Sequence, residues 1–366
     1  MISIVVPCYN CEKFLYTAVE SLLNQSIIWK AKTGQISEKR LFSDRYQIIL
    51  VDDGSSDNTS AICDTYAAKY NEKETDCGPW VKVVHQKNGG LMNAWKRGVL
   101  EADGDYIAFC DADDFVDPDL VERIESIVAA YHPDMILYGM IIEYNNGEKV
   151  KKANLLAPGL YNRNRIECEV FPHLYSNGTM QSELIAKSRC SKVFRKTLLQ
   201  QIMPDLDDGV STGEDDITTF AAILNADKLY CIGEYYPYHY LRNNESMIGS
   251  YDPGIFDKFE QWYENKRSIA LKYNYVYMKQ LEADYMSQYI LYIKKDICRT
   301  PGSIAQICNR LAKIRETDAF ISLAGKTSFE GYKVPERIFA YMFLHRWYLP
   351  MVFITRWIDK KRGRNV

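Results

Sequence analysis

The sequence lacks the two glycine-rich motifs that most often bind phosphate groups in α/β proteins. Neither G-x-G-x-x-G nor G-x-x-x-x-G-K-[ST] occurs in its 366 residues, so the chain has neither a dinucleotide fingerprint nor a P-loop. Any bound diphosphate must therefore be met by side chains and by a metal ion.

Long apolar runs are also missing. No run reaches the roughly 20 residues of a transmembrane helix. The first ten residues, MISIVVPCYN, contain neither a basic segment nor a cleavage site, so we expect no signal peptide. The net charge of −3 gives no general indication of nucleic-acid binding. We expect a cytoplasmic protein that binds no nucleic acid.

Cysteine and histidine form no metal pattern. The motif CYNC (8–11) matches C-x-x-C in letters, but it follows an apolar run and no second pair stands at metal spacing. This disfavours a zinc or redox role. We interpret most of the ten cysteines as small buried residues in a reducing compartment.

What the first half does contain is a regular alternation of strand and helix. Apolar runs predict buried strands, and apolar residues at helical spacing predict helices between them. Asn10, and either Ser56 or Asp57, are suited to cap the first two helices. The predicted strands are 2–7, 46–51, 81–86 and 103–110, and the predicted helices are 14–23, 62–67, 91–99 and 120–131. Strand–helix–strand repeats of this length predict a mostly parallel central sheet flanked by helices, an α/β fold.

The remaining segments are less regular. Residues 26–45 are polar and predict a long loop, and residues 255–320 are predominantly of helical pattern. We therefore expect a helical C-terminal region after the sheet.

Acidic residues follow two of the predicted strands. Asp52 and Asp53 close the second strand, and Asp111, Asp113 and Asp114 close the fourth. The carboxyl ends of parallel strands share one edge of a sheet, where ligands commonly bind. Clustered carboxylates are hard oxygen ligands that suit Mg²⁺ or Mn²⁺. The alternative is that such residues only form turns and cap helices, which we favour for other aspartates nearby but not for Asp111 and Asp113.

Four sequence blocks resemble those of family 2 glycosyltransferases of the GT-A fold. They are ISIVVPCYN, IILVDDGSSDNT, NGGLMNAWKRGVLEADGDYIAFCDADDFVDPD and GEDD, and they occur in the family's order within residues 1–250. The resemblance implies a GT-A (Rossmann-like) domain over 1–250, with a nucleotide-sugar half at about 1–115 and an acceptor half at about 116–250. A helical region over 251–366 would follow.

The resemblance also implies roles for the donor side. The nucleotide base would lie near Pro7 and Tyr9, and Asp53 would accept its N–H. Asp111 and Asp113 would form the D-x-D motif, which touches the ribose and the metal on the diphosphate. Whether Asp113 or Asp114 is the direct metal ligand stays open.

Further residues follow from the GEDD block and two later segments. Asp215 matches the general base, although the neighbouring acids leave the register less certain. Lys192 and Arg195 would face the site, and Arg242 and Ser246 would approach the diphosphate.

The chain departs from the family pattern at Trp95. Many members carry arginine at this position, so one expected donor-side cation is missing. Lys96 or Arg97 could compensate, but we favour a surface role for both.

The roles of these residues are consistent with a single reaction, the transfer of a sugar from a nucleotide. A metal ion, Mn²⁺ or Mg²⁺, and a cation such as Arg242 would stabilise the diphosphate leaving group. Asp215 would take the proton of an acceptor hydroxyl, and a single base opposite the leaving group implies inversion. We expect an inverting transferase with a nucleotide-sugar donor, UDP being the commonest in the family, and a saccharide or lipid-linked acceptor in polysaccharide or surface-glycan synthesis.

Two alternatives remain. A catalytically inactive GT-A scaffold that only binds nucleotide would have little use for intact acidic motifs. A sugar nucleotidyltransferase would need a glycine-rich, Lys- or Arg-bearing loop after the first strand, which PCYNCEKF does not provide.

The C-terminal segment 337–366 alternates aromatic and basic residues. It suits either an amphipathic helix pair on the cytoplasmic face of the inner membrane or a helical hairpin packed on the protein. Membrane contact would suit a lipid-linked acceptor.

Overall fold

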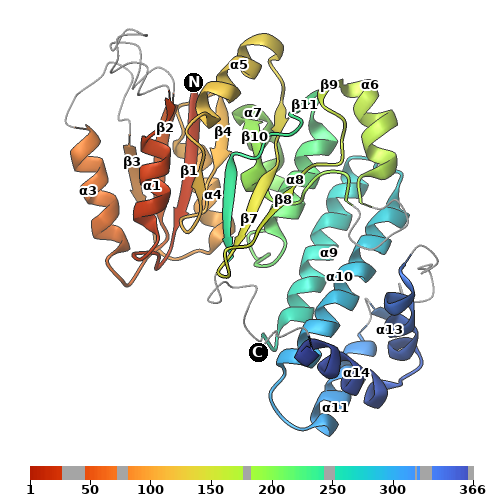
Figure 1. The fold of residues 1–366 in the computed structure, drawn as a ribbon. Helices are drawn as coiled ribbons and strands as arrows, with labels where there is room; N and C mark the ends of the chain where they lie inside the picture. The colour runs from red at the N-terminus through yellow and green to blue at the C-terminus, as the bar shows by residue number, and fades with distance from the viewer. Residues whose placement is uncertain are drawn as a thin grey trace. The chain divides into compact units, whose positions relative to one another are not determined.

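The computed structural model describes residues 1–26, 46–71, 81–175, 183–242, 252–317, 320–321 and 332–361. Figure 1 shows their arrangement as a ribbon. The predicted loop at 26–45 lies, apart from its first residue, outside the described residues, and so does Ser246.

The main sheet has eight strands in the order β3-β2-β1-β4-β10-β6-β11-β9. Its first four strands are mutually parallel, because each is reached from the last through a helical crossover. β10 runs antiparallel to both of its neighbours, and β9 is an antiparallel edge strand. The strands are β1 (Ile2–Cys8), β2 (Tyr46–Asp52), β3 (Val81–His85), β4 (Tyr106–Phe109), β6 (Met135–Leu137), β9 (Gly159–Asn162), β10 (Lys192–Arg195) and β11 (Lys228–Cys231). The predicted α/β fold with a mostly parallel central sheet is confirmed.

Helices flank this sheet (Figure 1). α4 comes unusually close to β1, because Gly98 faces the strand: a Cβ atom there would lie 2.2 Å from Cγ1 of Val5. The helices of this part are α1 (Leu15–Leu23), α3 (Thr59–Asn71), α4 (Leu91–Glu101), α5 (Leu120–Tyr131), α6 (Arg163–Arg165), α7 (Lys196–Ile202) and α8 (Glu214–Asn225). Short helical turns cover Ile166–Val170, Phe171–His173, Arg189–Ser191 and Met203–Asp205.

A second sheet has the order β5-β12-β7-β8. β12 (Tyr238–Arg242) pairs antiparallel with β5 (Phe115–Val116) and parallel with β7 (Met140–Tyr144), and β8 (Lys149–Lys152) completes the sheet. Because β5 directly follows Asp114, this sheet brings β12 beside the acidic motif.

The chain divides into two compact units. Unit 1 comprises Met1–Val170 and Ala186–Asn243, and unit 2 comprises Phe171–Ile185 and Asn244–Val366. The segment 171–185, which lies inside the expected domain 1–250, thus packs with the later helices. The domain boundary near residue 250 stays a prediction.

Unit 2 is helical. Its core is rich in aromatic residues: the rings of Trp262 and Tyr285 stack with their centroids 6.2 Å apart. The helices are α9 (Ile255–Lys272), α10 (Met278–Arg299), α11 (Ile304–Arg315), α13 (Val334–Leu344) and α14 (Tyr348–Lys361). None of the helices among the described residues is long and apolar enough to span a membrane.

Candidate active site

The acidic motif after β4 folds into a tight turn that is tied to β12. The backbone N–H of Asp114 donates to the carbonyl of Asp111 at 3.1 Å, and that of Asp111 donates to the hydroxyl of Tyr238 at 3.1 Å. The carboxylate of Asp114 is fully buried and accepts from the Tyr238 hydroxyl at 2.5 Å and from the backbone N–H of Leu241 at 2.8 Å. Asp114 therefore fixes the turn to the second sheet.

Asp111 and Asp113 remain half-buried at the surface of this turn. The side chain of Asp113 accepts from no other residue in the part of the chain that the structure describes, and burial raises its pKa. Both oxygens of Asp114 accept hydrogen bonds from protein donors. Of Asp113 and Asp114, Asp113 is therefore the better placed to hold a metal ion.

Asp215 approaches the same turn from the first turn of α8. Gly213 precedes the helix with a left-handed backbone (φ 79°), and Glu214, Asp215 and Asp216 form the helix N-terminus, where negative charge is favoured. Burial, followed by the charge of Asp215, raises the pKa of Asp111 to about 7. Two carboxylates that are 104 positions apart in the sequence thus influence each other electrostatically.

Arg189 lies between these acids and was not anticipated from the sequence. Its side chain is 1% exposed, and its Nη1 lies 3.0 Å from Oδ1 of Asp215. The guanidinium also lies 5.3 Å from the ring of Trp95 and 4.9 Å from that of Phe109, within cation–π range. The departure at Trp95 was the available signal, since the cation expected there is absent and a buried arginine from another element packs against its ring.

The three acids at the start of α8 differ in the residues that they contact. Asp216 is buried, and its Oδ2 lies 3.8 Å from Nζ of Lys187. Burial and the charge of Asp215 raise the pKa of Glu214. Asp215 alone of the three forms an ion pair with Arg189 among the described residues, which supports the register in which Asp215 is the functional acid.

The end of β1 and the start of the following turn form the other part of the site. Pro7 is buried in β1 opposite Val51, whereas the side chain of Tyr9 is 54% exposed. The Asp53 carboxylate accepts from Nε2 of Gln86 at 2.7 Å and from the backbone N–H groups of Gly89 and Gly90, both at 2.8 Å. These bonds take three of the roughly four acceptor positions of a carboxylate, and Asp53 itself is buried. Its contact with a nucleotide base stays a prediction.

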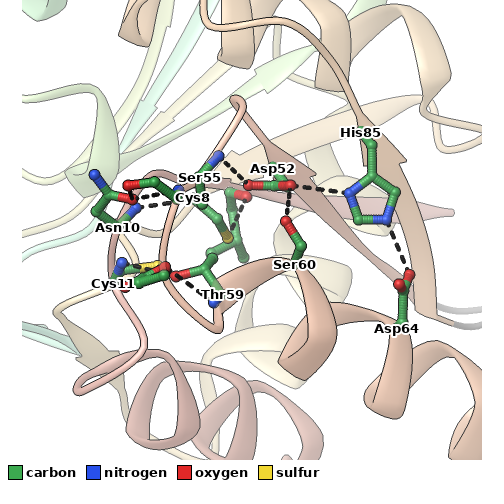
Figure 2. A network of polar contacts seen from close by, with 12 residues as sticks. Cys8, Asn10, Cys11, Asp52, Ser55, Thr59, Ser60, Asp64 and His85 are labelled. Atoms are coloured by element: carbon green, nitrogen blue, oxygen red, sulfur yellow. Dashed lines mark hydrogen bonds and ion pairs between the residues drawn. The ribbon is translucent and has the colours of Figure 1, made fainter.

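Asp52 stabilises the adjacent turn (Figure 2). Its Oδ1 accepts from the backbone N–H of Ser55 at 3.1 Å, and its Oδ2 contacts the Ser60 hydroxyl and Nδ1 of His85, the latter at 2.9 Å. His85 is also bonded through Nε2 to Asp64 at 2.9 Å. Burial alone would raise the pKa of Asp52, but the hydrogen bonds from Ser55, Ser60 and His85 lower it overall. Asp52 is thus a structural carboxylate.

The predicted capping of the first helix by Asn10 is wrong. Asn10 adopts a left-handed backbone (φ 48°), and its Oδ1 accepts from the backbone N–H of Ser56 at 2.8 Å. Asp57 does satisfy the start of α3, because its Oδ1 accepts from the Thr59 N–H at 3.0 Å.

Lys192 and Arg242, two of the predicted cations, lie in different environments. Lys192 is fully buried, and its Nζ donates to the carbonyls of Ala186 and Ser188, both at 2.5 Å, while burial lowers its pKa to about 7. Its contact with a donor stays a prediction. Arg242 is exposed at the end of β12, directly after Leu241, and its guanidinium lies 5.4 Å from the ring of Tyr144.

The expectation that Arg195 faces the site is wrong. Arg195 pairs with Tyr106 at the start of β4, which is the opposite edge of the sheet from Asp111, and its Nε lies 2.9 Å from Asp134. The cause is that β10 runs antiparallel to β4, so residues later in β10 move away from the acidic turn.

The carboxylates of the acidic turn do not by themselves complete a metal site. In the described part of the chain, no group of three or more His, Cys, Asp and Glu side chains is arranged to hold a metal ion. Asp111 and Asp113 nevertheless fit a divalent ion that takes further ligands from a diphosphate and water, as Mg²⁺ commonly does. A bound cation would offset what raises these two pKa values: burial disfavours the ionised form of both groups, and the charge of Asp215 also disfavours that of Asp111.

The sequence matches a protein-family model and several curated proteins. The family model, described as glycosyl transferase family 2, matches residues 3–202. The uncharacterized glycosyltransferase EpsJ of Bacillus subtilis is 24% identical over 99% of this chain and 96% of its own length. The poly(ribitol-phosphate) beta-N-acetylglucosaminyltransferase TarS of Staphylococcus aureus (strain Mu50) is 23% identical over 92% of this chain. The glycosyltransferase GlyA of Streptococcus pneumoniae serotype 4 is 24% identical over 68% of this chain. The chain spans only part of the length of these two relatives, 50% of that TarS and 32% of GlyA.

The fold also resembles solved structures. Residues 1–349 of Staphylococcus aureus TarS, crystallised with UDP-GlcNAc, superpose with a TM-score of 0.61 at 20% identity, covering 99% of this chain and 92% of that one. This similarity concerns the fold and extends over both units of the chain.

Proposed function

This chain belongs to glycosyl transferase family 2, and we propose that it transfers a sugar from a nucleotide-sugar donor to a hydroxyl of a saccharide or lipid-linked acceptor in surface-glycan synthesis. The observation that carries the proposal is the meeting of Asp111, Asp215 and Arg189 beside the end of β4. The structural similarity to TarS crystallised with UDP-GlcNAc supports UDP as the nucleotide. The relatives TarS and EpsJ, both described as glycosyltransferases, support the assignment of sugar transfer.

The donor would bind along the ends of β1, β2 and β4. Its base would lie near Pro7 and the exposed ring of Tyr9. The remaining acceptor position of Asp53 would take the N–H of the base, and the three protein donors to this carboxylate would hold it in place. Asp53 therefore links base recognition to the loop that begins α4.

The diphosphate would lie at the acidic turn. Asp113, with Asp111, would hold a Mn²⁺ or Mg²⁺ ion, which when bound supplies positive charge to the diphosphate. Arg242 follows Leu241, which is bonded to Asp114, and its exposed guanidinium would reach the phosphate oxygens. Lys192 is buried and its pKa is lowered to about 7, so near neutral pH only its protonated fraction would add positive charge to the site.

Asp215 would act as the general base. A carboxylate on the side opposite the leaving group takes the proton of the acceptor hydroxyl as the oxygen attacks the anomeric carbon, and this displacement inverts the configuration. The ion pair with buried Arg189 orients the carboxylate of Asp215 for this step. The base is thus positioned by a cation from a different element.

The rival assignments are an inactive nucleotide-binding scaffold and a sugar nucleotidyltransferase. The convergence of the acids with Arg189 favours a reacting site over a scaffold, since a binding module would not require a paired carboxylate. The turn after β1 is held by Asn10, Ser56 and Thr59 and carries no glycine-rich segment, which disfavours the nucleotidyltransferase.

The test is nucleotide release from a panel of sugar nucleotides, with and without Mn²⁺, for the wild-type protein and Asp215→Asn. We expect wild-type turnover with a UDP-sugar and a loss of about 10²-fold or more in Asp215→Asn, the range for a general base, with UDP binding retained. UDP binding without turnover on any donor and acceptor would favour the scaffold. Loss of UDP binding in Asp215→Asn would contradict the role as base.

We also propose a location at the cytoplasmic face of the inner membrane through residues 337–366. Of this segment, the structure describes residues 337–361.

A further inference from the structure

The last helix, α14, is apolar on the half that faces away from the protein. Its buried side chains are Met351 and Val352. The opposite half carries large exposed apolar side chains, with Phe353 at 55% and Trp357 at 58% exposure. At 3.6 residues per turn, one half of the helix surface holds Leu349, Phe353, Ile354, Trp357 and Ile358. A helix that is apolar on both halves is normally covered on both, so this half lacks a cover in the folded chain.

The preceding helix, α13, extends the same surface. Val334, Ile338 and Tyr341 are 51–64% exposed and recur at helical spacing on one side. The turn between the two helices carries exposed Trp347, whose ring meets that of Tyr341 edge-on with centroids 5.8 Å apart. We call these exposed residues of α13, the turn and α14 the C-terminal apolar face.

Positive charge borders the C-terminal apolar face. Arg337, Arg346, Lys360 and Lys361 are exposed, and Nζ of Lys361 lies 4.0 Å from the ring of Trp357. The acids of these helices are turned elsewhere. Glu336 is half-buried and accepts from the backbone N–H of Lys333 at 3.1 Å. Half-buried Asp359 faces Cys298 of α10.

The two helices are held firmly to the rest of unit 2. The side chain of Arg356 donates to the carbonyls of Ile297 and Thr300, at 3.1 and 3.2 Å, at the end of α10. Phe343 of α13 packs against Phe320, with ring centroids 5.1 Å apart. The C-terminal apolar face is therefore presented on a fixed support.

We infer that the C-terminal apolar face docks on an anionic phospholipid surface. Aromatic residues flanked by lysine and arginine match the headgroup region, where amphipathic rings and cations are both favoured. Exposed cations without exposed acids match the charge of anionic lipids. Since no described helix can span the bilayer, the contact is interfacial. The inference rests on the proposed function only in giving this location a purpose, because a lipid-linked acceptor lies at that surface.

The test is flotation of the full-length protein with vesicles of phosphatidylcholine alone or of phosphatidylcholine mixed with phosphatidylglycerol. We expect binding to the anionic vesicles, weakened by high salt. Combined Trp347→Ser, Phe353→Ser and Trp357→Ser should lower the partition coefficient at least about tenfold, because each large apolar side chain contributes to burial in the interface. Combined Arg346→Glu and Lys360→Glu should lower it at least about fivefold for each charge, and only on anionic vesicles.

The matched control is Val276→Ser. Val276 is 79% exposed but precedes α10 at the end opposite to the one that contacts α14, so its loss should leave binding unchanged. Asp215→Asn should float like wild type, which separates this inference from the proposed reaction. Circular dichroism of each variant checks folding.

Equal flotation of the wild type and the aromatic variant, or no binding of the wild type at low salt, would overturn the inference. A concentration-dependent dimer that the aromatic variant dissociates, with no vesicle binding, would identify a second copy as the occupant instead and would also overturn it.

Discussion

At the scale of single residues, the site depends on which carboxylates find partners within the protein. Asp114 is bonded to Tyr238 and Leu241, and Asp52 is bonded to Ser55 and His85. These acids shape the two turns. Asp215 pairs with Arg189 at 3.0 Å, and we propose that Asp111, Asp113 and Asp215 are the acids that serve ligands. A run of aspartates in the sequence therefore divides into structural and candidate functional residues according to their neighbours.

Arg189 is the residue whose substitution tests this view most directly. In Arg189→Met we expect kcat to fall by about 10²-fold, because a base that loses its orienting partner is displaced from the attack geometry. The KM for the donor should change little. Arg189→Lys should recover part of the activity, since it keeps the charge but not the planar guanidinium. Steady-state kinetics with a UDP-sugar, beside thermal unfolding to check folding, provide the measurement.

The opposite kinetic pattern would be informative. A raised donor KM with unchanged kcat would mean that Arg189 serves the diphosphate, as the cation that Trp95 does not supply, and not the base. Arg97→Met is the control, because Arg97 pairs at the surface with Glu101 at 2.7 Å and should have little effect on either constant.

At the scale of elements, the donor side is held by polar bonds between strand ends and helix starts. His85 at the end of β3 joins Asp52 at the end of β2 to Asp64 in α3 (Figure 2). The same region connects the turn after β1 to the start of α3, because the backbone N–H of Cys11 donates to the Thr59 hydroxyl at 2.9 Å. The turns that would receive the nucleotide base are thus fixed by β2, β3 and α3 together.

This network predicts a pH-dependent stability. Hydrogen bonds that the His85 ring donates to Asp52 and to Asp64 raise the pKa of His85 above its usual 6.5. A raised folded-state pKa means that its stabilisation is complete below pH 6.5 and is lost as the pH rises through the raised value. We therefore expect the melting temperature to decline across this interval in the wild type, and His85→Gln to lose that decline.

Thermal unfolding between pH 5.5 and pH 9 (about the interval that a histidine titration covers) provides the measurement. His345→Gln, a change at an exposed histidine of unit 2, should keep the wild-type pH profile. An unchanged profile in His85→Gln would show that the network does not titrate in this way.

At the scale of the whole molecule, the chain combines an α/β unit that carries the candidate site with a helical unit that has its own core. The helical core contains a buried ion pair, Lys266 Nζ to Asp284 Oδ2 at 3.0 Å, with side chains 1% and 4% exposed. The ammonium of Lys266 also lies 3.5 Å from the ring centroid of Tyr175, so Tyr175 is fastened to α9.

Asp284→Ala tests whether the two units are energetically separate. Removing one partner of a buried pair leaves an uncompensated charge and costs about 3–5 kcal/mol, so unit 2 should unfold at lower urea. If unit 1 is stable by itself, UDP binding should persist beyond that transition. Tryptophan fluorescence and UDP binding along one urea titration give the comparison.

Glu264→Ala is the matched control. Its contact with Arg267 is exposed and 4.0 Å long, and such pairs contribute at most about 1 kcal/mol. Simultaneous loss of fluorescence signal and UDP binding in Asp284→Ala would mean that the units unfold as one.

Local patterns were sufficient for much of this protein. The strands and helices around the first four β-strands follow from apolar periodicity and agree with the structure to within a few residues, because burial on both faces of a parallel sheet leaves a continuous apolar run. The acidic turn after β4 and the acid-rich start of α8 could likewise be located from contiguous residues.

The sequence by itself thus determined the α/β fold class, the order of the elements in the first half of the chain and the positions of the acidic segments, all of which depend on neighbouring residues. Only the tertiary structure decided that Arg189 pairs with Asp215, that Asp114 is structural and that Arg195 lies at the far edge of the sheet. The physical reason is that a side chain's partner and burial depend on segments about a hundred residues away and on strand direction, which local spacing does not encode.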